Sequence, residues 1–333
     1  MSQAGERLWG WWHAFDRPVT LWITLAAAAV LLLALPAIEL LARLRGLSPA
    51  LHRELRVRTL SWMVLLPLMI GPVLLGAAWT IAAVAVLSLW CYREYARVTG
   101  LFREKLVSLC VVLGILLLTF ASLDHWYNFF MALTPLVTVL IAIATIPLDR
   151  PQGYVQRVAL GMLGFLLLGS GLGHLGYMAN DWSYWPIVLL LLLAVAANDV
   201  FAFIVGKSLG GPRLLPATSP NKSVSGALGA LVLTTLLVTL LGGPVFAGTP
   251  MAGLAHRIGL GLIVAALGQL GDLTLSSIKR DVGIKDSGTI IPGHGGVLDR
   301  FNSLLLVAPA AFHYIGYFNG FGLDQPARII TGP

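Results

Sequence analysis

The chain alternates between long apolar runs and short polar segments. A membrane-spanning helix needs about 20 mainly apolar residues to cross a hydrocarbon core about 30 Å thick. The run over residues 60–91 is long enough for a hairpin of two short spans, broken by Pro67 and by Gly71-Pro72 or Gly76. The other runs of this kind predict spans over residues 21–41, 106–123, 129–148, 158–178, 184–209, 227–246, 258–275 and 304–321. The pattern therefore predicts an all-α, polytopic membrane protein with about ten transmembrane helices.

Composition leaves little room for a soluble domain. Hydrophobic residues make up 57% of the chain and charged residues 11%, against roughly 45–50% and 25% in an average soluble protein. We divide the chain into a tryptophan-bearing interfacial segment (residues 1–20), N-terminal transmembrane helices (21–180), a C-terminal transmembrane region expected to hold the catalytic groups (181–322) and a tail (323–333).

Lysine and arginine are distributed asymmetrically along the chain. All but four of the 22 follow the first, third, fifth, seventh or ninth predicted span, the exceptions being Arg7, Arg17, Arg257 and Arg328. Basic segments remain on the cytoplasmic side of a membrane, so both termini are expected on the opposite side. The formal charge of +7 then reflects membrane orientation. No basic stripe is interleaved with exposed aromatic residues, so membrane lipids are predicted partners and nucleic acids are not.

Two carboxylates interrupt predicted spans. Asp199 follows Asn198 in one apolar run, and Asp272 lies in another. A charge at the centre of a span costs about 2.5–3.5 kcal/mol on insertion scales, which makes such residues candidates for function. The alternative is that each is a helix-end residue paired with a nearby cation, Lys207 or Lys279.

Helical spacing adds neighbours to the second carboxylate. At about 100° per residue, Gly268, Asp272, Ser276 and Lys279 share one face of a helix. Mg²⁺ prefers oxygen ligands and keeps waters or substrate phosphates in its shell. With Asp299 added from the following segment, three carboxylates (Asp199, Asp272 and Asp299) could converge on one or two divalent ions, which we predict to be Mg²⁺.

Two polar segments supply cations and hydroxyl groups. The first follows Lys207, is rich in Gly, Pro, Ser and Thr, and contains Arg213 and Lys222. It suits anionic oxygens, although solvated loops look similar. The second reads KRDVGIKDSGTIIPGHGGVLDR, where glycines permit backbone conformations closed to other residues and flank His294. We expect this histidine, beside Asp299 and Arg300, to contact substrate.

These segments together resemble a family signature. The blocks Ser276-Ser277-Ile278-Lys279-Arg280, Lys285-Asp286-Ser287-Gly288 and Pro292-Gly293-His294-Gly295-Gly296-Val297-Leu298-Asp299-Arg300 resemble the signature of the phosphatidate cytidylyltransferases, or CDP-diacylglycerol synthases. Upstream, Asn198-Asp199, Gly206-Lys207 and Ser219-Pro220-Asn221-Lys222 resemble other blocks of the same family. The similarity is strongest over roughly residues 196–305.

The resemblance implies a Mg²⁺-dependent transfer at the cytoplasmic side of a bacterial inner membrane. Phosphatidic acid or a related lipid phosphate would attack the α-phosphorus of CTP, giving CDP-diacylglycerol and pyrophosphate. It implies metal ligation by Asp272 and Asp299 first and Asp199 next. Phosphates would be held by Lys222, Lys279, Arg280, Lys285 and Arg300, with Ser219, Asp286 and His294 orienting the site and Asn198, Lys207 and Arg213 as further substrate-binding candidates. The oligomeric state stays open, a homodimer included.

The chain departs from the family pattern in two places. The family usually places a second Asp where this chain has Asn302, and Lys, Thr, Trp and Glu where it has Asn221, Ser223, Val224 and Ser225. An amide coordinates metals without supplying negative charge. The alternatives are therefore a paralogue with a different lipid-phosphate acceptor or reduced activity and, on the intramembrane carboxylates alone, a transporter.

Overall fold

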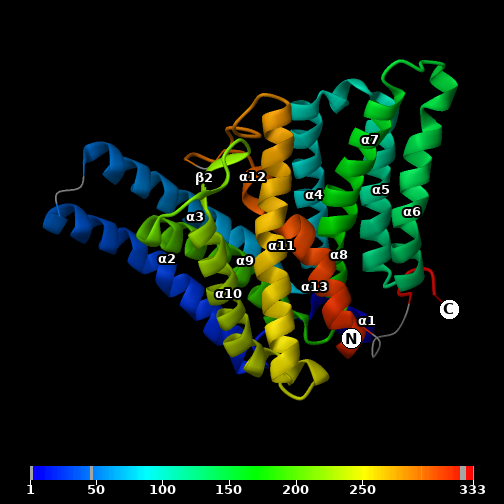
Figure 1. Cartoon of the computed structure of the whole chain (residues 1–333). Coiled ribbons are helices and arrows are strands. Elements are labelled where there is room, and N and C mark those ends of the chain that lie inside the picture. The colour runs from blue at the N-terminus through cyan, green and yellow to red at the C-terminus, as the bar shows by residue number, and fades with distance from the viewer. Residues whose placement is uncertain (1–2, 46–47, 294, 323–327, 333) are drawn as a thin grey trace.

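The computed structural model describes residues 3–45, 48–293, 295–322 and 328–332, and helices dominate it (Figure 1). Among these residues, nine helices are long and apolar enough to cross a membrane. A further long helix, α4 (Ala77–Thr99), carries charged residues in its last turns. The expectation of a polytopic membrane protein is confirmed, with a count within one of the expected ten. The first five long helices are α2 (Pro18–Arg45), α3 (Pro49–Leu75), α4, α5 (Lys105–Leu123) and α6 (Tyr127–Ala144).

The second half begins with a composite span. It consists of α7 (Tyr154–Gly164), the π-helical turn η4 (Phe165–Gly171) and α8 (Leu172–Met178). Three long helices and one final composite span follow: α9 (Tyr184–Leu209), α10 (Val224–Val245), α11 (Leu254–Asp281), and α12 (Leu298–Phe301) leading into α13 (Leu304–Asn319). The shorter elements are α1 (Gln3–Trp9), η1 (Trp11–His13), η2 (Leu101–Arg103), η3 (Ile146–Leu148) and η5 (Pro250–Ala252).

The arginine-rich segment 42–58, which lies between two predicted spans, is largely helical. Helix α2 extends to Arg45, and α3 begins at Pro49, where the Ser48 hydroxyl accepts a hydrogen bond from the Leu51 amide at 3.3 Å. Serine followed by proline is a strong start signal for a helix, so the turn is much shorter than predicted. Pro67 lies inside α3, and the chain bends instead at Gly76, whose φ is +125°.

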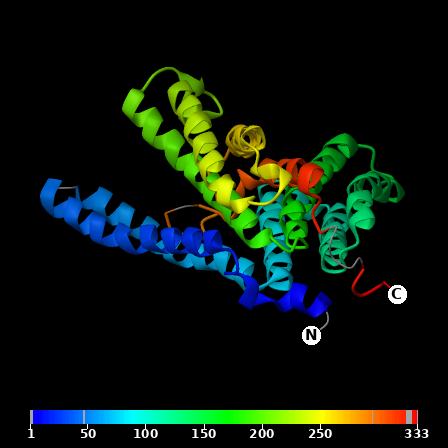
Figure 2. The ribbon, with the colours of Figure 1, turned by 90° about the horizontal axis from the view of Figure 1, so that it is seen from below.

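The polar segments that are distant in sequence gather at one end of the molecule. Figure 1 shows both chain termini at the lower end and the hairpin of β1 (Arg213–Leu215) and β2 (Ser219–Ser223) with α12 toward the other. The hairpin is antiparallel, a small β element in a fold predicted to be all-α. Below it, α9, α10 and α11 pack against one another. Figure 2 shows α2 and α3 as a pair that extends away from the main helical body.

Candidate active site

Asp272 is the centre of the first polar cluster at this end. It projects from α11, and one of its carboxylate oxygens forms an ion pair with the Lys222 ammonium group of β2. The other oxygen accepts a hydrogen bond from the Asn302 side-chain amide, at the end of α12. The Asn302 carbonyl oxygen in turn accepts from the Ser303 amide at 2.8 Å. The side chain of Asp272 is 22% exposed, so this cluster remains accessible to a ligand.

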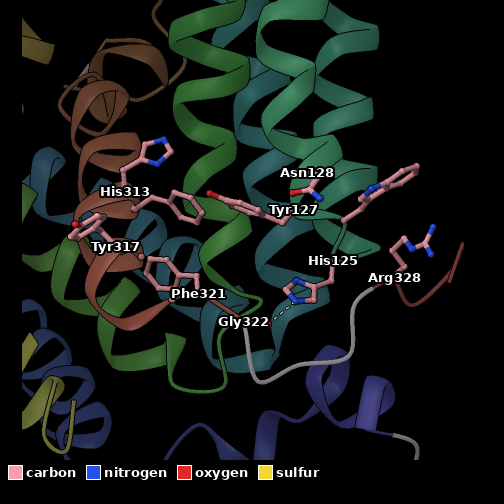
Figure 3. Close-up of a pocket in the computed structure, with 12 residues that line it drawn as sticks. His125, Tyr127, Asn128, His313, Tyr317, Phe321, Gly322 and Arg328 are labelled. Atoms are coloured by element: carbon pink, nitrogen blue, oxygen red, sulfur yellow. Dashed lines mark hydrogen bonds between the residues drawn. The ribbon is translucent and has the colours of Figure 1, made fainter. Parts of the chain in front are cut away.

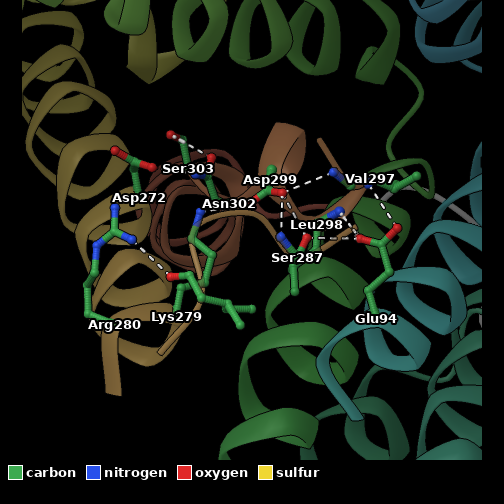
Figure 4. A network of polar contacts seen from close by, with 12 residues as sticks. Glu94, Asp272, Lys279, Arg280, Ser287, Val297, Leu298, Asp299, Asn302 and Ser303 are labelled. Carbon is green, nitrogen blue, oxygen red and sulfur yellow. Dashed lines mark hydrogen bonds and ion pairs between the residues drawn. The ribbon is translucent and has the colours of Figure 1, made fainter. Parts of the chain in front are cut away.

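Asp299 is the centre of the second cluster and is more deeply buried. Its Oδ1 atom accepts a hydrogen bond from the Lys279 ammonium group of α11 at 2.7 Å. Its Oδ2 atom accepts from the Ser287 amide at 2.8 Å, the Ser287 hydroxyl at 2.9 Å and the Gly296 amide at 3.0 Å. Asp299 and Lys279 are only 6% and 9% exposed. This pair therefore fixes the 287–299 segment against the end of α11 (Figure 4).

Glu94 of α4 completes the network from the N-terminal half of the chain. Its two oxygens accept hydrogen bonds from the amides of Val297 at 3.1 Å and Leu298 at 2.9 Å. The Ser287 hydroxyl lies 3.2 Å from Glu94 Oε2, so it bridges the two buried carboxylates. Figure 4 shows Ser287 and Leu298 between Glu94 and Asp299.

Asp199 belongs with the first cluster. It projects from α9 and lies within electrostatic reach of Asp272, Lys222 and Arg300. Within the described part of the chain, no three His, Cys, Asp or Glu side chains form a metal site by themselves. Asp199 and Asp272 nevertheless supply the hard oxygen donors that Mg²⁺ prefers, and Mg²⁺ usually completes its shell with waters and substrate phosphates. The donor set fits one such ion.

The predicted convergence of three carboxylates is not what the geometry shows. Four donors already surround Asp299, and Asp272 lies in the other cluster with Lys222 and Asn302. Metal ligation by Asp299 stays a prediction, and so do the metal-binding roles of Asp199 and Asp272.

Four further predicted residues lie at the end of α11, just after it or on α12: Arg280, Lys285, Asp286 and Arg300. Arg280 donates to the Ile284 carbonyl at 2.9 Å and the Thr218 carbonyl at 3.3 Å, joining the end of α11 to the β1–β2 hairpin. Arg300 is exposed on α12, and Lys285 and Asp286 are exposed in the segment after α11. His294 lies outside the described residues. The roles of all these side chains toward substrate stay predictions.

The predicted residues near the hairpin are less closely grouped. Ser219 is half-buried in β2, and Arg213 of β1 donates to the Asn221 carbonyl at 3.4 Å. Lys207 lies over the Phe203 ring, 5.5 Å from its centroid. None of these three has a described contact with Asp272 or Asp299.

Asn198 has a different position from the one expected of a substrate-binding group. It is fully buried, accepts from the Thr234 hydroxyl at 3.0 Å and donates to the Ala265 carbonyl at 3.3 Å. Its amide therefore joins α9 to α10 and α11. In this geometry Asn198 orients the helix that carries Asp199.

An apolar cavity lies beside the Asp299 cluster. It has a volume of about 610 Å³ and is bounded by α3, α4 and α9 and by the 290–301 segment, including Val297 and Phe301. Leu68, Trp79 and Trp90 contribute to its wall. Val297 and Phe301, which line the cavity, flank Asp299 in the chain, so the cavity reaches the Asp299 cluster.

A second cavity of about 700 Å³ lies at the opposite end of the bundle. Its wall includes His125, Tyr127, His313 and Arg328, at the end of α13 remote from α12 (Figure 3). No aspartate or glutamate is among its described lining residues. We therefore place the candidate active site at the Asp272 and Asp299 clusters.

Comparison with known proteins identifies the family. The chain matches the Cytidylyltransferase family over residues 56–318. It belongs to this family. The match includes both halves of the polar network, from Glu94 to Asn302, and confirms the resemblance inferred from the motifs.

Individual relatives agree with this membership. Over 270 residues the chain is 31% identical to the uncharacterized protein YnbB of Escherichia coli (strain K12), covering 79% of this chain and 87% of YnbB. It is 33% identical over 222 residues to the phosphatidate cytidylyltransferase of Bacillus subtilis (strain 168), covering 65% and 81%. It is 41% identical over 157 residues to that of Helicobacter pylori, covering 47% and 56%.

Sequence reasoning missed Glu94 and treated Ser287 only as part of a motif. The segment YREYARV was interpreted through its arginines, which mark the cytoplasmic face. A glutamate next to the end of an apolar run was a signal of the same kind as Asp272. Its partner segment lies about 200 residues later in the chain, so spacing offered no means to pair them.

Proposed function

We propose that this member of the cytidylyltransferase family transfers CMP from CTP to phosphatidic acid. A phosphate oxygen of the lipid forms a new bond to the α-phosphorus of CTP, and the bond from that phosphorus to the oxygen bridging to the β-phosphate breaks. The products are CDP-diacylglycerol and pyrophosphate. The attacking group is already an anion, so the reaction depends on positioning and charge neutralisation more than on a general base.

The observation that carries this proposal is the position of the two polar clusters beside the apolar cavity. Lys222 pairs with Asp272, Arg300 lies within electrostatic reach of Asp199, and Arg280 joins the end of α11 to the β1–β2 hairpin. Phosphate groups would be held by these cations. The cavity of about 610 Å³ begins at Val297 and Phe301 and suits an acyl chain. A polar nucleotide and an apolar lipid tail would therefore meet at the Asp299 segment.

Asp199 and Asp272 are the residues we propose to hold Mg²⁺. A bound Mg²⁺ would neutralise phosphate charge. Lys222 already neutralises Asp272 in the described structure, so it would move to a phosphate oxygen when a cation takes its place. The basic segments orient this end toward the cytoplasm of a bacterial cell, where CTP is available.

Asn302 favours a second candidate, a different lipid-phosphate acceptor. Its amide donates to Asp272, whereas a second aspartate in its place would add negative charge to the site. The charge near Asp272 is therefore less negative with Asn302 than with an aspartate, and a different lipid headgroup would fit best.

The decisive experiment incubates the purified protein with radiolabelled CTP, Mg²⁺ and a series of lipid phosphates. Phosphatidic acid is expected to give a labelled liponucleotide and pyrophosphate. A label transferred only to another lipid phosphate would support the second candidate. The absence of any labelled lipid, with folding confirmed by a cooperative thermal transition, would overturn both.

A further inference from the structure

We propose that Glu94 of α4 is a positioning residue that holds the Asp299-Arg300 segment in its active geometry. This inference rests on the proposed transfer of CMP and adds a role for the N-terminal half of the chain. Glu94 is 4% exposed, although it lies in a helix whose neighbouring Arg93 and Arg97 are exposed. A buried carboxylate is costly unless several donors satisfy it. Among the described residues, two backbone amides donate to Glu94, and it shares the Ser287 hydroxyl with Asp299.

The donors come from the residues that lead into the catalytic segment. The amides of Val297 and Leu298 immediately precede Asp299 in the chain, and both are bound by Glu94 at 3.1 and 2.9 Å. Backbone amides at the start of a helical turn have no partner within the helix. The Glu94 carboxylate supplies that partner and so fixes the direction in which α12 begins.

Ser287 links Glu94 to Asp299. Its hydroxyl lies 3.2 Å from Glu94 Oε2 and 2.9 Å from Asp299 Oδ2, and its amide donates to the same Asp299 oxygen at 2.8 Å. A serine hydroxyl has one proton and can donate to one of the two carboxylates at a time. The three residues therefore form one connected unit, which ends at the Lys279 ion pair.

Two glycines of the motif, Gly288 and Gly296, leave room for the Glu94 carboxylate. A Cβ atom at Gly288 would lie 3.2 Å from Glu94 Oε1, and one at Gly296 would collide with Glu94 Oε2 and lie 2.9 Å from the Gly288 amide nitrogen. Two glycines in a segment expected to contact substrate thus make room for a side chain from α4. The glycines of the sequence signature and the buried Glu94 therefore pack against each other.

The consequence for catalysis is geometric. Arg300 and Asp299 follow directly after the amides that Glu94 holds, so loss of Glu94 would let both side chains shift. A displacement of about 1 Å in a catalytic constellation can reduce the rate by about 100-fold. Glu94 contacts the chain near the reacting groups and acts through Asp299 and Arg300.

The test compares Glu94→Ala and Glu94→Gln with the control Glu39→Gln. Glu39 is an exposed glutamate of α2 that pairs with His52 and Arg56. Hydrogen exchange is measured on the full-length protein without substrates, over peptides that cover residues 287–299. We expect exchange about tenfold faster in Glu94→Ala, a smaller increase in Glu94→Gln, which keeps one acceptor oxygen, and no change in Glu39→Gln.

Steady-state kinetics provide the second measurement. The kcat value should fall in the order wild type, Glu94→Gln, Glu94→Ala, by about tenfold or more in the last, while KM for CTP changes less than about threefold. If Glu94 had a purely structural role, its loss would lower Tm without lowering kcat more than it changes KM for CTP. Wild-type exchange rates in Glu94→Ala, or an unchanged kcat, would overturn the proposal. If wild-type protein transfers no CMP, the proposed function fails and with it the catalytic role, while exchange still decides whether Glu94 orders the segment.

Discussion

The side-chain amide of Asn302 donates a hydrogen bond to the carboxylate of Asp272, joining the end of α12 to α11. This contact lies where the family usually has a second aspartate. The amide and Lys222 together satisfy both oxygens of Asp272. Asp272 is therefore held in place by side chains from β2 and from the end of α12.

The first prediction concerns Asn302→Asp. The change would bring two carboxylates into contact, and like charges at this distance repel unless a cation separates them. In the presence of a chelator we expect Asn302→Asp to have a lower Tm than wild type. Added Mg²⁺ should raise the Tm of the variant by more than it raises that of wild type. The activity of the variant should be kept or raised. Thermal melts at graded Mg²⁺ concentrations measure this. Asn302→Ala, which adds no charge, is the control. Loss of activity at saturating Mg²⁺ would mean that the site has been reorganised around the amide.

The second prediction concerns Asp272→Asn. Removing the carboxylate removes the proposed Mg²⁺ ligand and the partner of Lys222, so CMP transfer should fall by about 100-fold or more. The protein should still reach the membrane and melt cooperatively, because Asp272 is partly exposed. Asp149→Asn is a matched control, since Asp149 is exposed and has a left-handed backbone that asparagine tolerates. Retained activity would remove Asp272 from the metal site.

The third prediction separates Asp299 from Asp272. Asp299→Asn leaves the buried Lys279 ammonium group without its carboxylate, and breaking a buried pair in this way costs about 3–5 kcal/mol. We expect both lost activity and a clearly lower Tm. The double variant Asp299→Asn with Lys279→Met should regain much of the Tm and none of the activity. A single variant as stable as wild type would contradict the buried ion pair.

The fourth prediction concerns the C-terminal tail at Asp124, at the end of α5. Burial raises the pKa of Asp124, but hydrogen bonds from the Thr331 hydroxyl and from the Ile330 and Thr331 amides, with Arg328 nearby, outweigh it, and the pKa falls below 3.8. A lowered pKa stabilises the fold above the pKa of the unfolded chain and ceases to do so as the pH falls through the folded value.

The contribution of Asp124 should accordingly be complete near neutral pH and be lost progressively as the pH falls below 3.8 toward the lower pKa of the folded state. Asp124→Asn is expected to lower Tm at pH 7. Thermal melts from pH 7 to pH 3 should show the two proteins converging at the acid end. A difference in Tm that stays constant across this range would exclude titration of Asp124 as its source.

The helices could be predicted because length and polarity determine them almost alone. The span predicted over residues 184–209 has the bounds of α9, and the face shared by Asp272 and Lys279 exists because α11 is continuous. The predicted spans stopped at residue 41 and resumed at residue 60 because the segment between them is rich in arginine. Helical structure tolerates arginine well, and the Ser48-Pro49 start signal was the better guide.

Most members of the two polar clusters could be predicted, with Glu94 as the exception, but their pairing could not. Lys279 was placed beside Asp272 from helical spacing, yet its ammonium group binds Asp299. Partner choice depends on how α12 returns to α11 and on the hairpin that brings Lys222 to Asp272. These are tertiary relationships between segments 20 to 50 residues apart, and one-dimensional periodicity holds no information on them.

The origin of Glu94 in α4 has a consequence for biosynthesis. Every other member of the two clusters comes from residues 199–303, so Glu94 is translated before all of them. The Glu94 carboxylate is therefore synthesised before the groups of Ser287, Val297 and Leu298 that donate to it. A chain interrupted before α12 would contain the Glu94 carboxylate without the Val297 and Leu298 amides that donate to it.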